Sequence, residues 1–466
     1  MLKISVRDFG PIGSGEIELR PLTVLVGPNN VGKSYLGLLS YAVAHSALIP
    51  PRVPWLRSFT FPGEHVDEAV LELFGEHFPN GLRKWFRASA KGRAEGKVPV
   101  EHLRSITKLL EQLVAAVCRT AGREVQRCFA ANFGDLSRRG ASGLSFAVHG
   151  EGVAFSLTWD SGSDKPSERV SPTTFLPGTP RIRGRSAEDF LLGLAVQLFK
   201  DWPSGAFYFP AARSGLLQSH KLLASAVVGR SSLAGIEPLA IAPLPGVTAD
   251  FLRLFLELQP RYPLLERQDR NRELRDVVRL LEAEVTRGQI SLLSGEEKSV
   301  YPEIVYRSSA GSIPMGRSSS MIAEIAPLVL LLKHRIRKGD MLIIEEPEAH
   351  LHPDNQRVLA RGLVRLVNSG VSVMLTTHSD RFLQQLSNHV RLGRRPALAA
   401  KFGYGPEDHL DAGDVSAYLV DSDRASPETG THARALPVTP EDGIPEDVFL
   451  AVQEALYDET VALDDA

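Results

Sequence analysis

The stretch Leu22–Leu39, LTVLVGPNNVGKSYLGLL, restricts the possible folds of this chain more than any other. It begins with an apolar run, Leu22–Val26, rich in β-branched residues, which is typical of a strand buried on both faces of a parallel sheet. Gly27–Ser34 then follows the pattern G-x-x-x-x-G-K-S, and the residues after it favour a helix. A strand, a glycine loop and a helix in this order predict a phosphate-binding loop.

The residues of this loop suit phosphate binding for reasons of backbone geometry and charge. Glycines let successive N–H groups point inward at phosphate oxygens, and the following helix adds the positive end of its dipole. We expect Lys33 to reach the β- and γ-phosphates and the Ser34 hydroxyl to ligate Mg²⁺. The expected cofactor-binding residues are therefore Gly27, Pro28, Asn29, Asn30, Val31, Gly32, Lys33 and Ser34.

A second motif, MLIIEEPEAHLHP, occupies Met341–Pro353. Its apolar strand ends in Glu345 and Glu346, and two adjacent carboxylates there are costly unless they face water, a metal or a catalytic site. In an ATPase the first acid helps to hold Mg²⁺ and the second polarises the attacking water as general base. We assign these roles to Glu345 and Glu346, the alternative being an acidic turn. The HxH pair that follows lacks an obvious third ligand, so no metal site is predicted there.

Two further stretches complete the predicted site. A buried strand at Val371–Leu375 ends in TTHSD, where His378 could hydrogen-bond a γ-phosphate and sense its loss. Upstream, Ser320 is a good N-cap for a helix with Glu324 in its first turn. The apolar residues of this predicted helix fall on one face: Ile322, Ile325, Val329 and Leu332.

Length, charge and hydropathy indicate a cytoplasmic protein of two or three domains. The chain has 466 residues, 43% of them hydrophobic, and a net charge of −2, so only a local patch would attract nucleic acid or a membrane. There is no apolar run of membrane-spanning length and no signal-peptide core. Two cysteines, Cys118 and Cys128, suggest neither a disulfide framework nor a zinc site.

The remaining segments predict an insertion and an acidic end. Residues 50–205 carry predicted helices at 100–131 and 187–202 and a predicted hairpin, 144–148 with 153–159. Within this region, residues 81–139 hold 13 Lys and Arg against 5 Asp and Glu. This excess indicates either a solvated helical face or a surface for nucleic acid or a partner. Residues 441–466 hold nine acids and no base, and they predict a helix at 447–457 that is either solvated or a docking tail.

Together these motifs resemble the ABC-type ATPase heads of the SMC, RecF and OLD families, bacterial AAA ATPases of the OLD-like class being nearest. The resemblance covers residues 1–47 and about 206–390. TVLVGPNNVGKS is similar to a Walker A motif, SSSMIAEIAPL to a signature, LIIEEPEAHLHP to a Walker B motif with its D-loop, and TTHSD to a switch. FYFPAARSG is similar to a Pro-Ala-x-Arg element, with Arg213 as its basic residue.

The resemblance implies an α/β P-loop NTPase fold, an ABC-type head with an N-terminal antiparallel β element and an inserted helical/β region. The implied parts are 1–49, 50–205, 206–390 and 391–466. It also implies ATP and Mg²⁺ as cofactors, Glu346 and His378 as catalytic residues, and a homodimer in which Ser319 or Ser320 of one chain caps nucleotide held by the other. Two departures are Met321 in place of a transporter's Gly-Gly and Glu345 in place of Asp. No Q-loop glutamine is assigned.

The sequence leaves three functions open for the predicted ATPase. In OLD nucleases a Toprim domain follows the ATPase, but only 88 residues follow His378 here, and Asp421-Ser-Asp423 is better interpreted as a hairpin turn. We therefore expect ATP turnover to regulate a separate effector, with a nuclease suspected and anti-phage defence as the setting. The alternative is a RecF-like DNA-repair ATPase that binds duplex DNA through the basic insertion. A scaffold that scarcely hydrolyses ATP is a third possibility.

Overall fold

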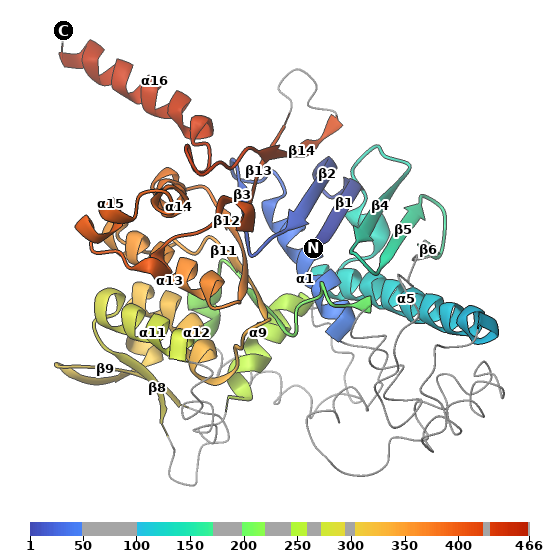
Figure 1. Cartoon of the computed structure of the whole chain (residues 1–466), viewed down its shortest axis with the longest axis horizontal. Coiled ribbons are helices and arrows are strands. Elements are labelled where there is room, and N and C mark those ends of the chain that lie inside the picture. Colours follow the sequence, from blue (N-terminus) through green and yellow to red (C-terminus); the bar gives the residue numbers. More distant parts are fainter. Residues whose placement is uncertain are drawn as a thin grey trace, which may run out of the picture. The chain divides into compact units, whose positions relative to one another are not determined.

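The structure is a computed structural model that describes residues 1–48, 100–170, 198–219, 244–258, 272–293, 303–422 and 429–464. Two compact units make up the chain (Figure 1). The first comprises Met1–Glu18, Ala42–Arg127 and Ala131–Pro203, and the second comprises Leu19–Tyr41, Cys128–Ala130 and Ser204–Ala466. Residues 187–197 of the predicted helix 187–202 lie outside the described residues, and 199–202 form turns rather than a helix. The basic residues between 81 and 99 also lie outside the described residues. The predicted four-part division stays a prediction.

The first unit contains a mainly antiparallel sheet with strand order β6-β5-β4-β1-β2. The two N-terminal strands are neighbours in the sheet and are joined by only Gly10 and Pro11, which agrees with the expected N-terminal antiparallel β element. The second predicted hairpin is confirmed by antiparallel pairing of β4 with β5. These strands are β1 (Leu2–Phe9), β2 (Ile12–Leu19), β4 (Gly143–His149), β5 (Ala154–Asp160) and β6 (Ser167–Val170).

Helix α5 (Val100–Phe129) is the long helix of the first unit, and the short helix α6 (Phe133–Leu136) follows it. The buried apolar residues of α5 recur at intervals of three and four, so they form one buried stripe: Ile106, Leu110, Val114, Val117, Ala121 and Val125. The helix predicted at 100–131 is thereby confirmed. Cys118 and Cys128 both lie in α5, and both are buried.

The second unit is built on a mixed sheet with strand order β14-β13-β3-β12-β11-β7 (Figure 1). Strand β3 (Leu22–Val26) pairs in parallel with β12 (Ser372–Thr377) and with β13 (Val415–Ser422). Strand β11 (Met341–Glu345) pairs in parallel with β12 and with β7 (Ala206–Phe209). All residues of β3 and β11 are buried, as parallel strands covered on both faces require. The predicted α/β P-loop NTPase fold is confirmed.

The register of these parallel strands positions the functional residues. Val26 lies opposite Thr377, and Glu345 lies opposite Thr376, so the carboxyl ends of β3, β12 and β11 meet at one edge of the sheet. Ligands of open α/β sheets bind at this kind of edge. The phosphate loop, the paired acids and the switch histidine therefore follow neighbouring strands.

One apolar core lies within the second unit. The helical elements that supply buried residues to it are α9 (Gly246–Leu256), α11 (Arg272–Leu280), η3 (Leu281–Val285), η4 (Met315–Arg317), α12 (Ser320–His334), α13 (Pro353–Asn368) and α14 (Asp380–Leu392). The other helical elements of this unit are α1 (Lys33–Leu48, which continues into the first unit), α15 (Pro396–Lys401), η5 (Pro406–Asp408), η6 (Ala412–Asp414) and α16 (Asp447–Asp464). The four apolar residues that the sequence places on one face of α12 are buried, which confirms that prediction. The structure adds that every residue from Ile322 to Leu332 is buried, because the core surrounds this part of the helix.

Two smaller β elements complete the second unit. Strands β8 (Gln289–Leu293), β9 (Glu303–Ser308) and β10 (Gly311–Pro314) form a separate small antiparallel sheet. The C-terminal hairpin pairs β13 with β14 (Thr431–Leu436). This pairing confirms the hairpin interpretation of this segment, although β13 extends through Ser422, so Asp421 lies opposite His432 in the strand rather than in the turn. Asp423 lies outside the described residues. None of the helices in the described ranges is long and apolar enough to cross a bilayer.

Candidate functional site

The loop after β3 has the backbone geometry of an anion cradle. Gly27, Asn30 and Gly32 have positive φ angles of 148°, 63° and 99°, and helix α1 begins at Lys33. A Cβ atom on Gly27 would lie 2.1 Å from the Val420 carbonyl oxygen, so only glycine fits beside β13 at this position. Such turns point backbone N–H groups into one concavity at a helix N-terminus, where an anion is favoured.

Lys33 closes this loop on itself. Its ammonium group is buried and donates hydrogen bonds to the carbonyl oxygens of Gly27 at 2.8 Å and Pro28 at 2.5 Å. Burial lowers the pKa of Lys33, and the charges of Glu346 and Glu348 oppose this effect. Ser34 is exposed at the start of α1, as are Asn29 and Asn30 in the loop. The lysine thus lies within the field of the acidic loop after β11.

The two predicted acids at the end of β11 have different surroundings. The Glu345 carboxylate accepts a hydrogen bond from the Ala211 N–H at 2.9 Å and is nearly buried. The Glu346 carboxylate lies 3.3 Å from Nδ1 of His378, and both side chains are partly exposed. The structure therefore brings Glu346 and His378 together and turns Glu345 toward the segment after β7.

Glu346 also has an unusual backbone conformation, with φ of +43°. Its N–H donates to the Thr376 carbonyl oxygen at 3.0 Å, and its own carbonyl oxygen accepts from Nη2 of Arg213 at 3.0 Å. Non-glycine residues rarely adopt positive φ, and they do so where the surroundings hold them there. The position of the Glu346 side chain is thus determined by contacts on both sides of its peptide group.

Glu348 is a third acid in this loop, which the sequence analysis did not single out. Its Oε1 accepts from the Thr377 hydroxyl at 2.5 Å and from the His378 N–H at 3.4 Å. Its Oε2 is buried and has no hydrogen-bond partner among the described residues. Burial raises the pKa of Glu348. The sequence EEPE could have indicated Glu348 as a site residue, because a charged residue two positions after Glu346 falls in the same tight loop.

Arg213 connects the acidic loop to helix α12. It is buried, it donates to the Glu345 carbonyl oxygen at 2.5 Å, and its guanidinium forms an ion pair with Glu324, whose side chain is fully buried. Burial lowers the pKa of Arg213, and the negative charges of Glu324 and Glu348 are the largest opposing effects. Arg213 and Glu324 were noted in the sequence, but their pairing across the chain was not predicted.

The predicted signature serines lie at the start of α12. Ser319 is the N-cap, and its hydroxyl accepts from the Ile322 N–H at 3.4 Å. Ser320 is the first helical residue, so its prediction as the N-cap is wrong by one position. Both serines are exposed, and in the described part of the chain neither forms a hydrogen bond with Gly27–Ser34.

The donor set of this edge suits magnesium better than a softer metal. The Ser34 hydroxyl and the carboxylates of Glu345, Glu346 and Glu348 are hard oxygen donors, and the unpartnered Oε2 of Glu348 leaves one of them unsatisfied. His352 instead caps α13, because its Nδ1 accepts from the Asp354 N–H at 3.3 Å. Among the described residues, no group of three or more histidine, cysteine or acidic side chains is arranged so that it could hold a metal ion by itself.

Comparison with known protein families supports an ATPase domain. Residues 268–383 match the family model described as an AAA ATPase domain. The matched span contains α12, the acidic loop and His378, whereas the loop Gly27–Ser34 precedes it. Among curated protein sequences, none matches this chain significantly.

Three solved structures of SMC heads are similar to the chain at low sequence identity. An SMC head bound to the C-winged helix domain of ScpA is 12% identical, covers 93% of this chain and 97% of that chain, and gives a TM-score of 0.44. An Smc head with an extended coiled coil, bound to the C-terminal domain of ScpA from Pyrococcus furiosus, is 11% identical, covers 98% of this chain and 100% of that chain, and gives a TM-score of 0.42. The SMC head domain from Thermotoga maritima is 9% identical, covers 94% of this chain and 98% of that chain, and gives a TM-score of 0.35.

Proposed function

We propose that this chain binds ATP with Mg²⁺ at Gly27–Ser34 and hydrolyses it. The observation that carries the proposal is the convergence of the phosphate loop, Glu346 and His378 on one edge of the sheet, within a chain whose residues 268–383 match an ATPase domain. Lys33 would exchange its two carbonyl contacts for phosphate oxygens, and the backbone of the loop would surround them.

In this proposal Glu346 is the general base. Its carboxylate is accessible, and His378, 3.3 Å away, can orient it or share a proton with it. Ser34 and Glu345 would hold Mg²⁺, which supplies charge neutralisation to the phosphates when it is bound. Glu345 contacts the Ala211 N–H in the structure, so its longer side chain would reach the metal through water or after a rotamer change.

We further propose an ABC-type head of the OLD-like class that closes as a dimer on ATP. The exposed Ser319 and Ser320 lie at the N-terminus of α12, a place where backbone N–H groups favour an anion. These residues suit a γ-phosphate held by a second chain. ATP turnover would then bias a separate effector, a nuclease in an anti-phage system, that contacts the open and closed states differently.

A second candidate function is direct binding of duplex DNA by the basic insertion. Helix α5 exposes Arg123, and the Arg119 side chain is half exposed with only a long contact of 3.3 Å to Glu168. Arg127, four residues further on, is committed to the buried Glu124 at 2.7 Å. Two arginines of this face are therefore available to phosphates, rather than the three that spacing alone suggests.

ATP binding and turnover test the proposed ATPase. Lys33→Ala is expected to remove most ATP affinity, because the point charge on the phosphates is lost. Glu346→Gln is expected to retain ATP affinity and to slow turnover about 10²–10⁴-fold. Glu273→Gln, an exposed glutamate on α11, is the matched control. Unchanged ATP affinity in Lys33→Ala would contradict the assignment of the phosphate loop.

The role of Mg²⁺ is tested separately. Glu345→Gln is expected to raise the Mg²⁺ concentration needed for half-maximal turnover, whereas Glu346→Gln should leave this midpoint in place and lower the plateau. Equal behaviour of the two variants would contradict separate roles. Closure on ATP should accumulate in Glu346→Gln, and light scattering should detect it as a mass that is larger with ATP than without ATP.

A further inference from the structure

Exposed apolar side chains gather on two elements that both follow the matched ATPase segment. Of the nine large hydrophobic side chains exposed among the described residues, six lie on or beside α15 and α16. Leu398 and Phe402 are 42% and 62% exposed at α15, and the other four, on α16, are Leu456, Tyr457, Val461 and Leu463. Isolated exposed apolar residues are ordinary, but such groups mark interaction surfaces.

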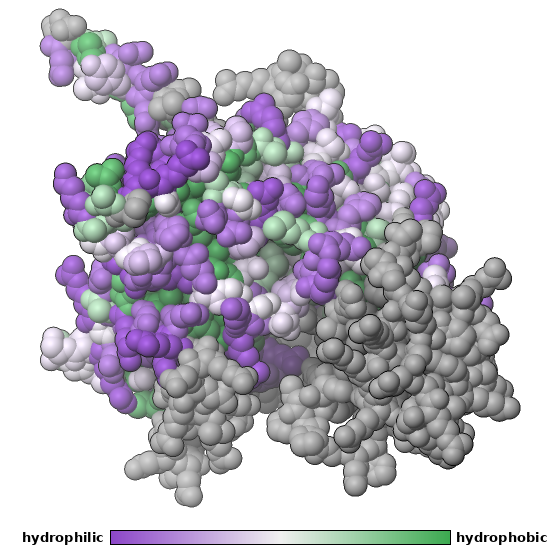
Figure 2. Space-filling model, in the orientation of Figure 1, coloured by the Kyte–Doolittle hydropathy of each residue, from purple (hydrophilic) through white to green (hydrophobic). Residues whose placement is uncertain are grey.

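The outer half of α16 has no packed face. Every side chain from Gln453 to Asp464 is exposed, and Figure 2 shows apolar and hydrophilic residues interspersed along this helix. Leu456 and Leu463 are seven residues apart and share one face of the helix. Helix α16 holds five acids and no base. A single helix of this length is marginal in water, so a partner surface would stabilise it.

The surface at α15 has the opposite charge. Residues 391–404 contain four basic residues and no acid. Of these, Arg395 and Lys401 are exposed and form no ion pair in the described part of the chain. Leu398 and Phe402, four residues apart, lie between these charges on one face. The surface therefore combines an apolar centre with a basic rim.

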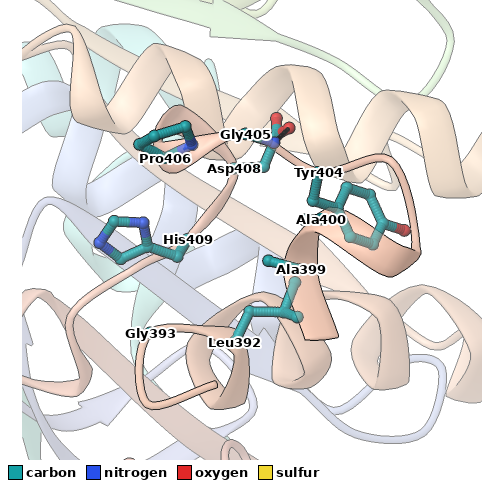
Figure 3. Close-up of a pocket in the computed structure, with 9 residues that line it drawn as sticks. All are labelled: Leu392, Gly393, Ala399, Ala400, Tyr404, Gly405, Pro406, Asp408 and His409. Atoms are coloured by element: carbon teal, nitrogen blue, oxygen red, sulfur yellow. Dashed lines mark hydrogen bonds between the residues drawn. The ribbon is translucent and has the colours of Figure 1, made fainter. Parts of the chain in front are cut away.

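A pocket of about 310 Å³ adjoins this surface (Figure 3). Leu392 and Ala399 line one side of it, and Pro406 and Asp408 line the other. The Asp408 carboxylate does not make the pocket acidic, because Arg361 and Arg365 bind it at 2.6–3.0 Å. The pocket can therefore accept an apolar side chain from a neighbouring helix.

The α16 of the same chain cannot reach this pocket. Three contacts lay residues 441–453 along α14: Arg394 with Glu441, the Ser387 hydroxyl with the Ile444 N–H at 3.0 Å, and Gln453 with Asp380 at 2.8 Å. Helix α16 therefore extends away from the body of the unit near the start of α14, whereas α15 follows the end of α14. The 13 residues of α14 separate the two ends by about 20 Å.

We propose that the outer half of α16 docks on the α15 surface of a second copy of this chain, with an apolar side chain in the adjoining pocket. A second copy is the occupant because the acidic helix and the basic rim complement each other, and each chain carries one of each. Reciprocal docking would give a closed pair with two equivalent contacts. This association needs no nucleotide, so it is distinct from the ATP-dependent closure proposed above.

Light scattering of the nucleotide-free protein across a concentration series tests the contact. The wild-type chain is expected to dimerise, and Leu456→Asp with Leu463→Asp is expected to give monomers. Ile313→Asp, at another exposed apolar residue, is the matched control and should dimerise like the wild type. Reversing the rim with Arg395→Glu and Lys401→Glu should weaken the dimer at least tenfold. Adding Asp458→Lys and Glu459→Lys to that variant should restore it.

A mixing experiment tests the identity of the two surfaces. A chain truncated after Glu446 keeps the α15 surface, and Leu398→Asp with Phe402→Asp keeps α16. Each is expected to be monomeric alone, and together they should form one-to-one pairs. A monomeric wild type at all concentrations, or a wild-type dimer unaffected by Leu456→Asp with Leu463→Asp, would overturn the proposal. ATP turnover is measured on the same samples, so loss of the dimer and loss of the ATPase are distinguished.

Discussion

Replacing Arg213 by methionine is expected to loosen the candidate site more than any other single change described here. The guanidinium holds the carbonyl oxygens of Glu345 and Glu346 and neutralises Glu324 in the core. Methionine fills a similar volume but offers no donor. Both carbonyl groups and one buried carboxylate would then lose their partner together.

The magnitude follows from burial. Removing one partner of a buried ion pair typically costs about 3–5 kcal/mol, because the remaining charge stays uncompensated. The Glu324 side chain is fully buried and the Arg213 side chain is 3% exposed, so solvent cannot take over. Because each 1.4 kcal/mol is a factor of ten, local opening of this region should increase about 10²–10³-fold.

Amide hydrogen exchange of α12 and β11 is the appropriate measurement. All four tryptophans of the chain precede residue 204, at positions 55, 85, 159 and 202, so tryptophan fluorescence would report on the wrong unit. Exchange of peptides that cover residues 320–334 and 341–347 reports directly on the two elements that Arg213 joins.

The control is the double variant Arg213→Met with Glu324→Met. Removing both charges should recover much of the lost protection, since a buried pair replaced by apolar residues is often neutral. Burial raises the pKa of Glu324 even beside Arg213, and loss of the arginine should raise it further. A carboxyl group whose pKa is raised in the folded state destabilises the fold as the pH rises above its ordinary pKa, so the stability defect of Arg213→Met should become smaller as the pH is lowered toward that ordinary pKa. Wild-type exchange in Arg213→Met would refute this reasoning.

Three other changes test separate features. Glu348→Gln should lower ATP turnover about 10–100-fold with ATP affinity retained, because the native Glu348 carboxylate accepts the hydrogen bond that positions Thr377 before the switch histidine. Unchanged turnover would show that this contact is dispensable. If the chain binds duplex DNA, the double variant Arg119→Glu with Arg123→Glu should abolish a mobility shift. The affinity of the wild type for duplex should fall with about the first power of the salt concentration for each phosphate neutralised. Absence of any shift with the wild type at low salt rules out the DNA function. Burial raises the pKa of Asp340 from 3.8 to about 6, so stability should fall as the pH rises through that interval. Asp340→Asn should remove this dependence and stabilise the second unit near neutral pH by up to about 3 kcal/mol, measured by urea unfolding followed by circular dichroism; an equal pH dependence in both proteins would exclude Asp340 as its source.

The parts of the site that lie within short motifs were predictable from the sequence. The strand, loop and helix around Gly27–Ser34 form one continuous pattern, and the acids after β11 end a single apolar run. Each of these signals depends only on local backbone preference and on residue order. The small sheet of β8, β9 and β10 was predictable for the same reason, since its strands are short and close in sequence.

Contacts between distant segments were not predictable in this way. Arg213 and Glu324 are separated by more than a hundred residues, and neither position alone shows that the other will neutralise it. The burial of Glu324 was also hidden, because a glutamate near a helix start ordinarily interacts with solvent and the helix dipole. The shift of the N-cap from Ser320 to Ser319 reflects a run of three serines, any of which can cap a helix.

The place of β13 beside β3 has a consequence for synthesis of the protein. Val420 forms the wall against which Gly27 turns, and the Thr431 hydroxyl donates to the Val31 carbonyl oxygen at 2.7 Å. These partners leave the ribosome almost four hundred residues after the loop they support, a delay of roughly 20–80 s at about 5–20 residues per second. For most of that time β3 has neither parallel neighbour, because β12 is synthesised only shortly before β13, so the growing chain exposes an aggregation-prone strand. Nascent chains should gain nucleotide affinity only once the hairpin of β13 and β14 has emerged.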